Sequence, residues 1–316
     1  MLQDIGLLIL GLFVLIVGGD FLVRGASSIA LRAHISPLVV GLTIVAFGTS
    51  APELLISINA ALSGNPDLAM GNVIGSNICN LALVLGVTVL IGPVRVNADS
   101  IKIDWPVAMI SALLLFWWAR DGELGVSEGV FFITFLLSYT FYIIRKSRKE
   151  NIAAIAMEEE LELPDGPSSS LYKDLFYLAI GGAGLYFGSD WFVGGAKELA
   201  TFLGVSQRVI GITVLALGTS LPELVTAIVA SFKRETDLAL GNLMGSNIFN
   251  ILSILGITSL IKPIAVNQTI LSVDMFWMLG ITLLILPMML IKRKLGKAEG
   301  IILLCIYVYY TYTVIS

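Results

Sequence analysis

Histidine and cysteine are almost absent from the sequence. His34 is the single histidine, and Cys79 and Cys305 are the two cysteines among 316 residues. One histidine excludes multi-histidine metal sites and catalytic triads built on a histidine base. Two cysteines far apart in apolar segments indicate neither a disulfide framework nor a thiolate metal cluster. The function must therefore rest on other side chains.

Charge is also scarce. Charged residues make up 13% of the chain, whereas a soluble domain carries about 25%. Hydrophobic residues make up 57%, and the mean hydropathy is +0.92. This composition predicts an all-α polytopic membrane protein in the lipid bilayer, and we expect no nucleic-acid partner. The first apolar run follows no basic region and precedes no small-residue cleavage site, so we expect it to be retained as a helix.

Apolar segments long enough to span a membrane recur along the whole chain. A membrane helix needs about 20 apolar residues. Ten transmembrane helices are predicted, at 3–26, 37–62, 68–91, 103–119, 126–145, 171–196, 207–231, 238–261, 270–291 and 299–315. The long polar connection at 147–170 is expected to be a cytoplasmic linker, amphipathic in its first half and flexible in its second. It divides a first five-helix repeat, 1–146, from a second, 171–316.

The two halves are an internal duplication. Gly41 aligns with Gly211, an offset of 170 residues, and 21 of the 40 residues in 41–80 are identical in 211–250. Each half has an odd number of helices, so the second must enter the membrane from the opposite side. This predicts two inverted repeats with a shared site near the midplane. With both termini outside, 15 of the 19 Lys and Arg residues fall on the inner side, as cytoplasmic loops require.

One duplicated motif places polar groups inside apolar segments. Its copies are Gly48-Thr49-Ser50-Ala51-Pro52-Glu53 and Gly218-Thr219-Ser220-Leu221-Pro222-Glu223. A carboxylate in a membrane helix is costly unless something compensates its charge. Proline lacks an N–H group and frees carbonyls one turn earlier. Carbonyl, hydroxyl and carboxylate oxygens suit Ca²⁺ or Na⁺. A proline kink with a hydrogen-bonded glutamate is the alternative, which the recurrence in register disfavours.

A second duplicated motif adds amide and hydroxyl groups. It runs from Gly71 to Asn80 and again from Gly241 to Asn250. In the first copy, Asn72, Ser76 and Asn80 are spaced to share one helix face, and the glycines beside them are expected to let helix backbones approach. These polar groups could simply hold helices together. Their recurrence opposite two glutamates instead predicts an oxygen cage, in which one Ca²⁺ or two Na⁺ would balance about two negative charges and protons would compete.

The paired motifs resemble the two alpha-repeats of the cation/calcium exchanger superfamily, and the chain is most similar to its prokaryotic sodium/calcium exchangers. The resemblance implies a core of the second, third, seventh and eighth helices, against which the first and sixth move. It places the ion ligands at Ala46, Thr49, Ser50, Glu53, Ser76, Asn80, Ala216, Thr219, Ser220, Glu223, Ser246 and Asn250. Some relatives carry Asp in place of Asn250, which leaves the number of bound Na⁺ ions open and argues against K⁺ co-transport.

These observations predict an antiporter that exchanges Na⁺ for Ca²⁺ across the cytoplasmic membrane by alternating access. It is expected to act as a monomer, to need no cofactor and not to be an enzyme. A Ca²⁺/H⁺ exchanger using the same glutamates is the nearest alternative. An ion channel is disfavoured because ligands from opposed repeats suit an occluding site. An intramembrane hydrolase using Ser50 or Ser220 is disfavoured because no membrane-embedded His or Lys could act as its base.

Overall fold

The computed structural model describes residues 2–158, 170–204 and 216–315, and these form a bundle that is helical almost throughout. The elements of the first half are α1 (Leu2–Ala33), α2 (Pro37–Val40), η1 (Gly41–Val45), α3 (Ala46–Thr49), α4 (Ala51–Leu62), α5 (Pro66–Ile78), η2 (Cys79–Val84), α6 (Leu85–Ile91), β1 (Val94–Arg95), η3 (Ser100–Asp104), α7 (Trp105–Trp118), η4 (Ala119–Asp121), β2 (Glu123–Leu124) and α8 (Val126–Glu158). Those of the second half are α9 (Leu171–Phe202), α11 (Ala216–Thr219), α12 (Leu221–Phe232), α13 (Thr236–Phe249), η6 (Asn250–Leu255), α14 (Gly256–Ile261), β3 (Ile264–Ala265), η7 (Ile270–Asp274), α15 (Met275–Leu290), β4 (Lys294–Leu295) and α16 (Lys297–Ile315).

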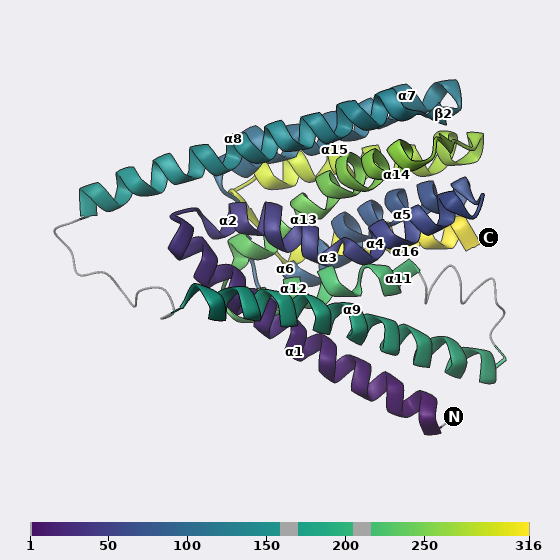
Figure 1. Ribbon diagram of the computed structural model, residues 1–316, viewed down its shortest axis with the longest axis horizontal. Helices are drawn as coiled ribbons and strands as arrows, with labels where there is room; N and C mark the ends of the chain where they lie inside the picture. Colours follow the sequence, from purple (N-terminus) through teal and green to yellow (C-terminus); the bar gives the residue numbers. More distant parts are fainter. Residues whose placement is uncertain (1, 159–169, 205–215, 316) are drawn as a thin grey trace.

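The helices run roughly along the long axis of the molecule, with the α1–α9 pair on one flank and α7 and α8 on the other (Figure 1). Six helices among the described residues are long and apolar enough to cross a membrane. A bent pair, Pro37–Thr49 with Ala51–Leu62, makes a seventh candidate. The protein is therefore a multi-span membrane protein. The predicted helix at 207–231 lies partly outside the described residues, so the count of ten stays a prediction.

Three helices are longer than the sequence predicted. α1 continues to Ala33, α8 to Glu158 and α9 to Phe202. The prediction counted only apolar residues, whereas a helix continues through polar residues once it leaves the hydrocarbon. The first part of the predicted linker is therefore an extension of α8 and not a separate amphipathic helix, and the rest of that linker, 159–169, lies outside the described residues.

Two short antiparallel sheets join the halves. β1 of the first half pairs with β4 of the second, and β2 pairs with β3. β1 and β3 are related by the 170-residue offset, since Val94 corresponds to Ile264. Each sheet thus contains one strand from each half, and this strand pairing holds the two halves together.

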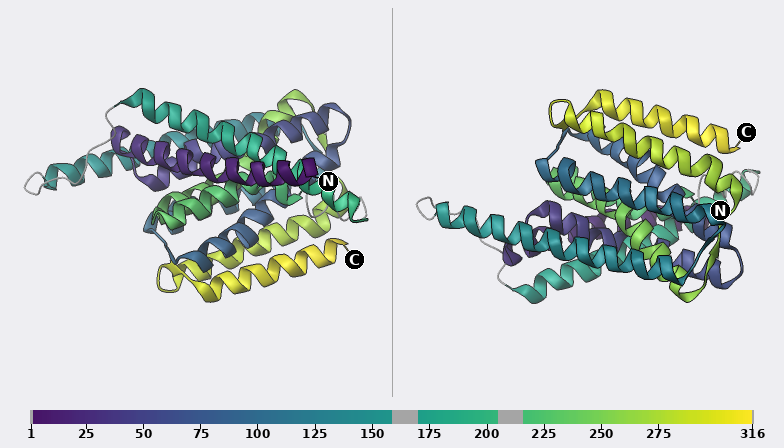
Figure 2. Two further views of the ribbon diagram at one scale, coloured as in Figure 1. Left: turned by 90° about the horizontal axis from the view of Figure 1, so that it is seen from below. Right: turned by 90° about the horizontal axis from the view of Figure 1, so that it is seen from above.

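A glycine seam joins α1 to α9, which lie side by side in the left view of Figure 2. On each helix the seam glycines are seven residues apart, and the two sets are related by the 170-residue offset. They are Gly11, Gly18, Gly25, Gly181, Gly188 and Gly195. A Cβ at Gly181 would lie 2.5 Å from the backbone nitrogen of Leu22, and one at Gly188 would lie 2.7 Å from that of Leu15. The two backbones touch because neither carries side chains there, so the pair forms one unit.

Three pairs of repeat-related turns use left-handed backbone, with glycine in one half and a different residue in the other. Gly64 (φ 78°) corresponds to Arg234 (φ 63°). Gly204 (φ 79°) corresponds to His34 (φ 55°). Gly122 (φ 93°) corresponds to Arg293 (φ 47°), because the Gly122 carbonyl accepts from Val266 and the Arg293 carbonyl accepts from Val96, the repeat equivalent of Val266. Glycine adopts this conformation without steric cost, whereas the other residues carry strain.

Candidate functional site

The duplicated Pro-Glu motif breaks two helices at the same point. Ser50 (φ −86°, ψ 7°) separates α3 from α4, and Ser220 (φ −88°, ψ 6°) separates α11 from α12. The first break bends the chain by 45°. Proline near the start of the second helix causes the break because it cannot donate to the preceding turn. Glu53 and Glu223 therefore lie in the first turn of a new helix, where the helix dipole favours a carboxylate.

Both glutamates are fully buried, and the two halves meet at their carboxylates. The Ser50 hydroxyl, from the first half, donates to Oε1 of Glu223 at 3.1 Å. The Ser246 hydroxyl donates to the same oxygen at 3.4 Å. Glu53 has Glu223 and Ser76 as close neighbours. The predicted convergence of the two motifs is thus present in the geometry.

Several buried oxygens at this point have no hydrogen-bond partner among the described residues. They are Oε1 and Oε2 of Glu53, Oε2 of Glu223, the hydroxyl of Ser220, and Oδ1 of Asn80 and Asn250. None of the ion pairs between described residues involves either glutamate. The described chain also gathers no group of three His, Cys, Asp or Glu side chains. The site therefore consists of two carboxylates surrounded by neutral oxygens, which is a donor set for hard cations.

The remaining predicted residues of the first half lie in the same region. Thr49 is buried, and its hydroxyl donates to Oδ1 of Asn242 at 3.1 Å and lies 3.3 Å from the carbonyl oxygen of Ala46. It is also 3.4 Å from the Ser246 hydroxyl. In the second half, Ala216 and Thr219 begin and end α11, and the side chain of Ala216 lies outside the described part of the chain.

The sequence reasoning gave no role to Asn77 and Asn247, which follow the serine in each copy of the duplicated motif. Asn77 accepts a hydrogen bond from Nδ2 of Asn250 at 3.0 Å and donates to the carbonyl of Asn247 at 3.4 Å. Asn72 turns elsewhere, donating to the carbonyl of Glu53 and to Ser57. The signal was the repeated Gly-Ser-Asn-Ile sequence, in which Asn77 and Asn247 recur in register. Asn77 accepts from the Nδ2 group of Asn250, and the Oδ1 atom of Asn250 is left without a partner among the described residues.

The glycines of this motif can be compared with the expected close approach of helix backbones. A Cβ at Gly245 would lie 2.7 Å from the Cα atom of Leu42, so α13 packs closely against η1 and the expectation is confirmed there. At Gly71 and Gly75 a Cβ would meet no described atom within 4 Å. The segment that the repeat would place beside them, 205–215, lies outside the described residues, so for α5 the close approach stays a prediction.

A second missed contact is made by Ser189 on α9. Its hydroxyl donates to the carbonyl oxygen of Gly218 at 2.7 Å. This is one of the carbonyls that Pro222 was expected to free. Ser189 corresponds to Gly19 in the first half, which has no hydroxyl to donate. The α1–α9 unit is thus hydrogen-bonded to the broken helix of the second half, whereas the equivalent position in the first half has no hydroxyl for such a bond.

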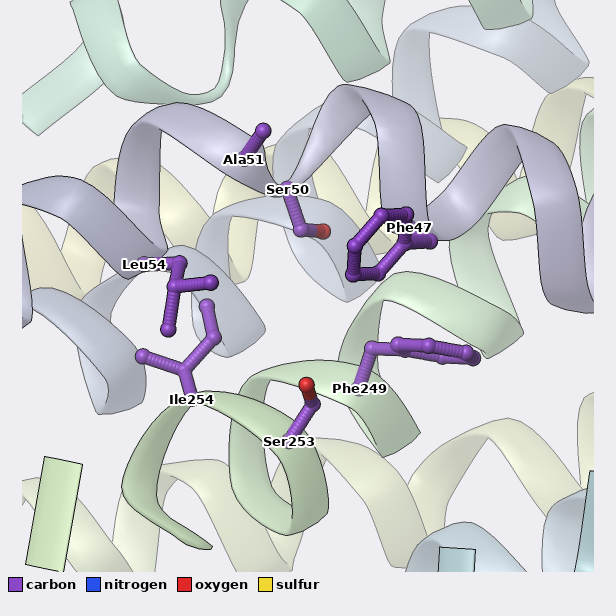
Figure 3. A pocket seen from close by; sticks show the side chains of 7 residues that line it. All are labelled: Phe47, Ser50, Ala51, Leu54, Phe249, Ser253 and Ile254. Atoms are coloured by element: carbon purple, nitrogen blue, oxygen red, sulfur yellow. The ribbon is translucent and has the colours of Figure 1, made fainter. Parts of the chain in front are cut away.

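A small hollow opens beside Ser50 (Figure 3). It has a volume of about 10 Å³, room for about one water molecule. Phe47 and Phe249 flank it with their rings edge to face at 6.1 Å, and the hydroxyls of Ser50 and Ser253 face it. Polar groups on its wall make it suitable for a bound water next to the carboxylates.

Comparisons with known proteins agree with this geometry. The profile of the family described as sodium/calcium exchanger protein matches residues 4–145 and 173–316. CaxA of Alkalimonas amylolytica is 39% identical over 98% of this chain and 97% of its own. The sodium/calcium exchanger MaX1 of Methanosarcina acetivorans is 34% identical over 96% of this chain and 95% of its own. A solved structure of the sodium-calcium exchanger NCX_Mj, soaked without Na⁺ and Ca²⁺, superimposes with a TM-score of 0.84 at 31% identity over 99% of both chains. The chain therefore belongs to the sodium/calcium exchanger protein family.

Proposed function

We propose that the protein is an antiporter that exchanges Na⁺ for Ca²⁺ across the cytoplasmic membrane, binding both ions between Glu53 and Glu223. The main support is that three buried carboxylate oxygens lack a partner among the described residues. An unpaired charge inside a protein is strongly unfavourable. A transported cation would neutralise these oxygens. The family, and the name of the relative MaX1, favour Na⁺ as the exchanged ion.

The proposed ligands extend beyond the two glutamates. Ser50, Ser76, Ser220 and Ser246 would contribute hydroxyls, Asn80 and Asn250 their Oδ1 atoms, and Ala46, Thr49, Ala216 and Thr219 largely backbone carbonyls. Two carboxylates balance one Ca²⁺ or two Na⁺. Three Na⁺ per Ca²⁺, which the family resemblance implies, would move one net charge per cycle and couple transport to voltage at about 2.3 kcal/mol per 100 mV.

We also propose ten membrane helices in two inverted repeats, 1–146 and 171–316, with a cytoplasmic linker at 147–170. The reciprocal strand pairing of β1 with β4 and β2 with β3 supports this arrangement. The first turn of α1 and the last turn of α16 lie at the right-hand end of Figure 1, and the last turn of α8 lies at the left. The proposed orientation places the right-hand end outside the cell.

Alternating access would involve the α1–α9 unit moving against the helices that carry the glutamates. The glycine seam supports this proposal because it holds α1 and α9 together more closely than either is held to the broken helices. The hydrogen bond from Ser189 to Gly218 would then break and form during the cycle.

Proteoliposomes loaded with Na⁺ are expected to take up calcium-45, and a membrane potential should change the rate if net charge moves. A K⁺ gradient alone should give no uptake. The measurement is initial uptake with imposed Na⁺, K⁺ or H⁺ gradients, with protein-free liposomes as the control. Uptake driven by a H⁺ gradient without Na⁺ would identify the alternative, a Ca²⁺/H⁺ exchanger at the same site. Flux independent of any counter-ion would instead indicate a channel.

A labelling experiment tests the orientation. Cys79 is buried and Cys305 is exposed, so the background is a Cys305→Ser variant. In intact cells, Thr313→Cys is expected to react with a membrane-impermeant maleimide, whereas Lys149→Cys should react only after permeabilisation. The reason is that an odd number of helices separates the two positions. Equal labelling of both in intact cells would contradict the inverted repeat.

A further inference from the structure

A second polar cleft lies away from the glutamates, at the end of the bundle that carries β1 and β4. Its volume is about 680 Å³. Its walls come from both halves, namely the end of α6 with Arg95 and the connection between α12 and α13. Three apolar helices meet this cleft: α6 ends there at Ile91, α12 ends there at Phe232, and α13 begins there at Thr236. The cleft is thus at the level where hydrocarbon gives way to lipid head groups.

The charged groups that line this cleft are not paired with each other. Arg95, Arg234, Glu235 and Asp237 all line it, yet no ion pair within 4.0 Å joins any of them to a described residue. The neighbouring Lys233 is occupied, because its ammonium lies 2.6 Å from the Asp20 carboxylate. The cleft therefore offers two guanidinium groups and two carboxylates to a ligand.

Arg234 occupies a position that favours glycine. It follows the end of α12 in left-handed backbone, with the Arg234 N–H bonded to the Ser231 carbonyl and the Glu235 N–H bonded to the Ala230 carbonyl. Gly64 makes the same turn after α4. The Gly64 N–H donates to the Ala61 carbonyl, and the Asn65 N–H donates to the Ala60 carbonyl. The duplicated turn therefore folds with glycine in one half, and the strained arginine in the other half points to a function for its side chain.

An apolar rim borders the charged groups. Phe232 is 72% exposed and Ile91 is 38% exposed, and both line the cleft. Lipid acyl chains are suitable partners for these side chains, whereas a soluble ion would leave them uncovered. Basic pockets at the cytoplasmic ends of membrane helices are known to hold lipid phosphates.

We propose that this cleft binds the head group of a zwitterionic phospholipid that carries a primary ammonium, that is, a phosphoethanolamine lipid. Arg95 and Arg234 bind the phosphate, and Glu235 and Asp237 accept hydrogen bonds from the ammonium. Two positive and two negative groups match a zwitterion better than a purely anionic head group. A choline head group fits less well, because its trimethylammonium has no N–H to donate. The lipid would bridge the two halves of the protein.

The test is lipid retention, measured by native mass spectrometry of delipidated protein offered equal amounts of phosphatidylethanolamine, phosphatidylcholine and phosphatidylglycerol. The wild type is expected to retain phosphatidylethanolamine at least about tenfold over the other two. Arg234→Gly should lose that retention by about tenfold while its melting temperature stays equal or rises, because the strain is relieved. Asp237→Asn should lower the preference for phosphatidylethanolamine over phosphatidylcholine.

The matched control is Arg120→Gln, whose guanidinium stacks on Trp117 at 5.5 Å and should leave lipid retention unchanged. Equal retention of the three lipids by the wild type, preference for phosphatidylglycerol, or unchanged retention in Arg234→Gly would overturn the proposal. Soluble glycerophosphoethanolamine distinguishes a lipid from a free phosphate ligand. If it stabilises the wild type as strongly as the lipid does at the same concentration, the lipid assignment is wrong. None of these readouts depends on transport.

Discussion

Glutamine in place of Glu53 or Glu223 is expected to reduce Ca²⁺ exchange by at least about 100-fold, equivalent to about 2.7 kcal/mol, in a protein that remains folded. Each change removes half of the negative charge of the site and keeps the shape of the side chain. Folding should survive because the glutamates have few hydrogen bonds to lose. Glu53 has none at its carboxylate among the described residues, and Glu223 receives two at one oxygen.

Calcium-45 exchange and thermal melting check this prediction together. Ca²⁺ at 100 times its Kd should stabilise the wild type by about 2.7 kcal/mol and should stabilise neither variant measurably. Glu123→Gln is the control, because this carboxylate lies exposed on β2. Exchange near the wild-type rate in either Glu53→Gln or Glu223→Gln would show that the two glutamates do not share the transport site.

Alanine at Gly181 is expected to destabilise the protein by about 2 kcal/mol, within the range for overpacked sites, and leucine there should prevent folding. The reason is that the new Cβ would lie 2.5 Å from the backbone nitrogen of Leu22 and 2.8 Å from its Cα atom. Backbone atoms in a helix cannot move aside as a flexible side chain can. α1 and α9 would move apart, and the hydrogen bond from Ser189 to the Gly218 carbonyl would be lost.

Gly182 supplies a matched control one residue away. A Cβ at Gly182 would meet nothing within 4 Å, so Gly182→Ala should be neutral or stabilise the helix by up to about 1 kcal/mol. Thermal melting in detergent and calcium-45 exchange should both rank Gly182→Ala above Gly181→Ala. Equal melting temperatures for the two variants would mean that the seam is not tightly packed.

The sequence predicted that Pro52 and Pro222 would free carbonyls one turn earlier inside continuous helices. The structure goes further and breaks both helices just before these prolines, at Ser50 and Ser220. The position could be anticipated because proline acts through its own covalent structure, whatever surrounds it. Duplication added long-range information, because two glutamates in register on halves that are predicted to be inverted can be expected to meet. The hydrogen bond from Ser189 to Gly218 could not be found in this way. It has no repeat partner, and it depends on which face of α9 turns toward the broken helix.

The asparagines show a different limit. Asn72, Ser76 and Asn80 share a helix face, but periodicity does not say which neighbour each side chain will select. Asn72 bonds to the carbonyl of Glu53, whereas Asn80 is left without a partner among the described residues. The length of α8 was misjudged for a related reason, since hydropathy marks where the hydrocarbon ends and not where a helix ends.

The strained turns at His34, Arg234 and Arg293 have a consequence for biosynthesis. During insertion, a nascent chain is sorted by its basic residues before any of these turns has folded. Under the proposed orientation, all three residues lie on the cytoplasmic side, and their glycine counterparts lie outside. Glycine would suit the folded turns better. It would, however, remove a basic side chain from a loop that must stay on the cytoplasmic side during insertion. Under that orientation, the divergence of the two halves at these turns would serve their insertion in opposite directions, and the strain in the folded turns would be its cost.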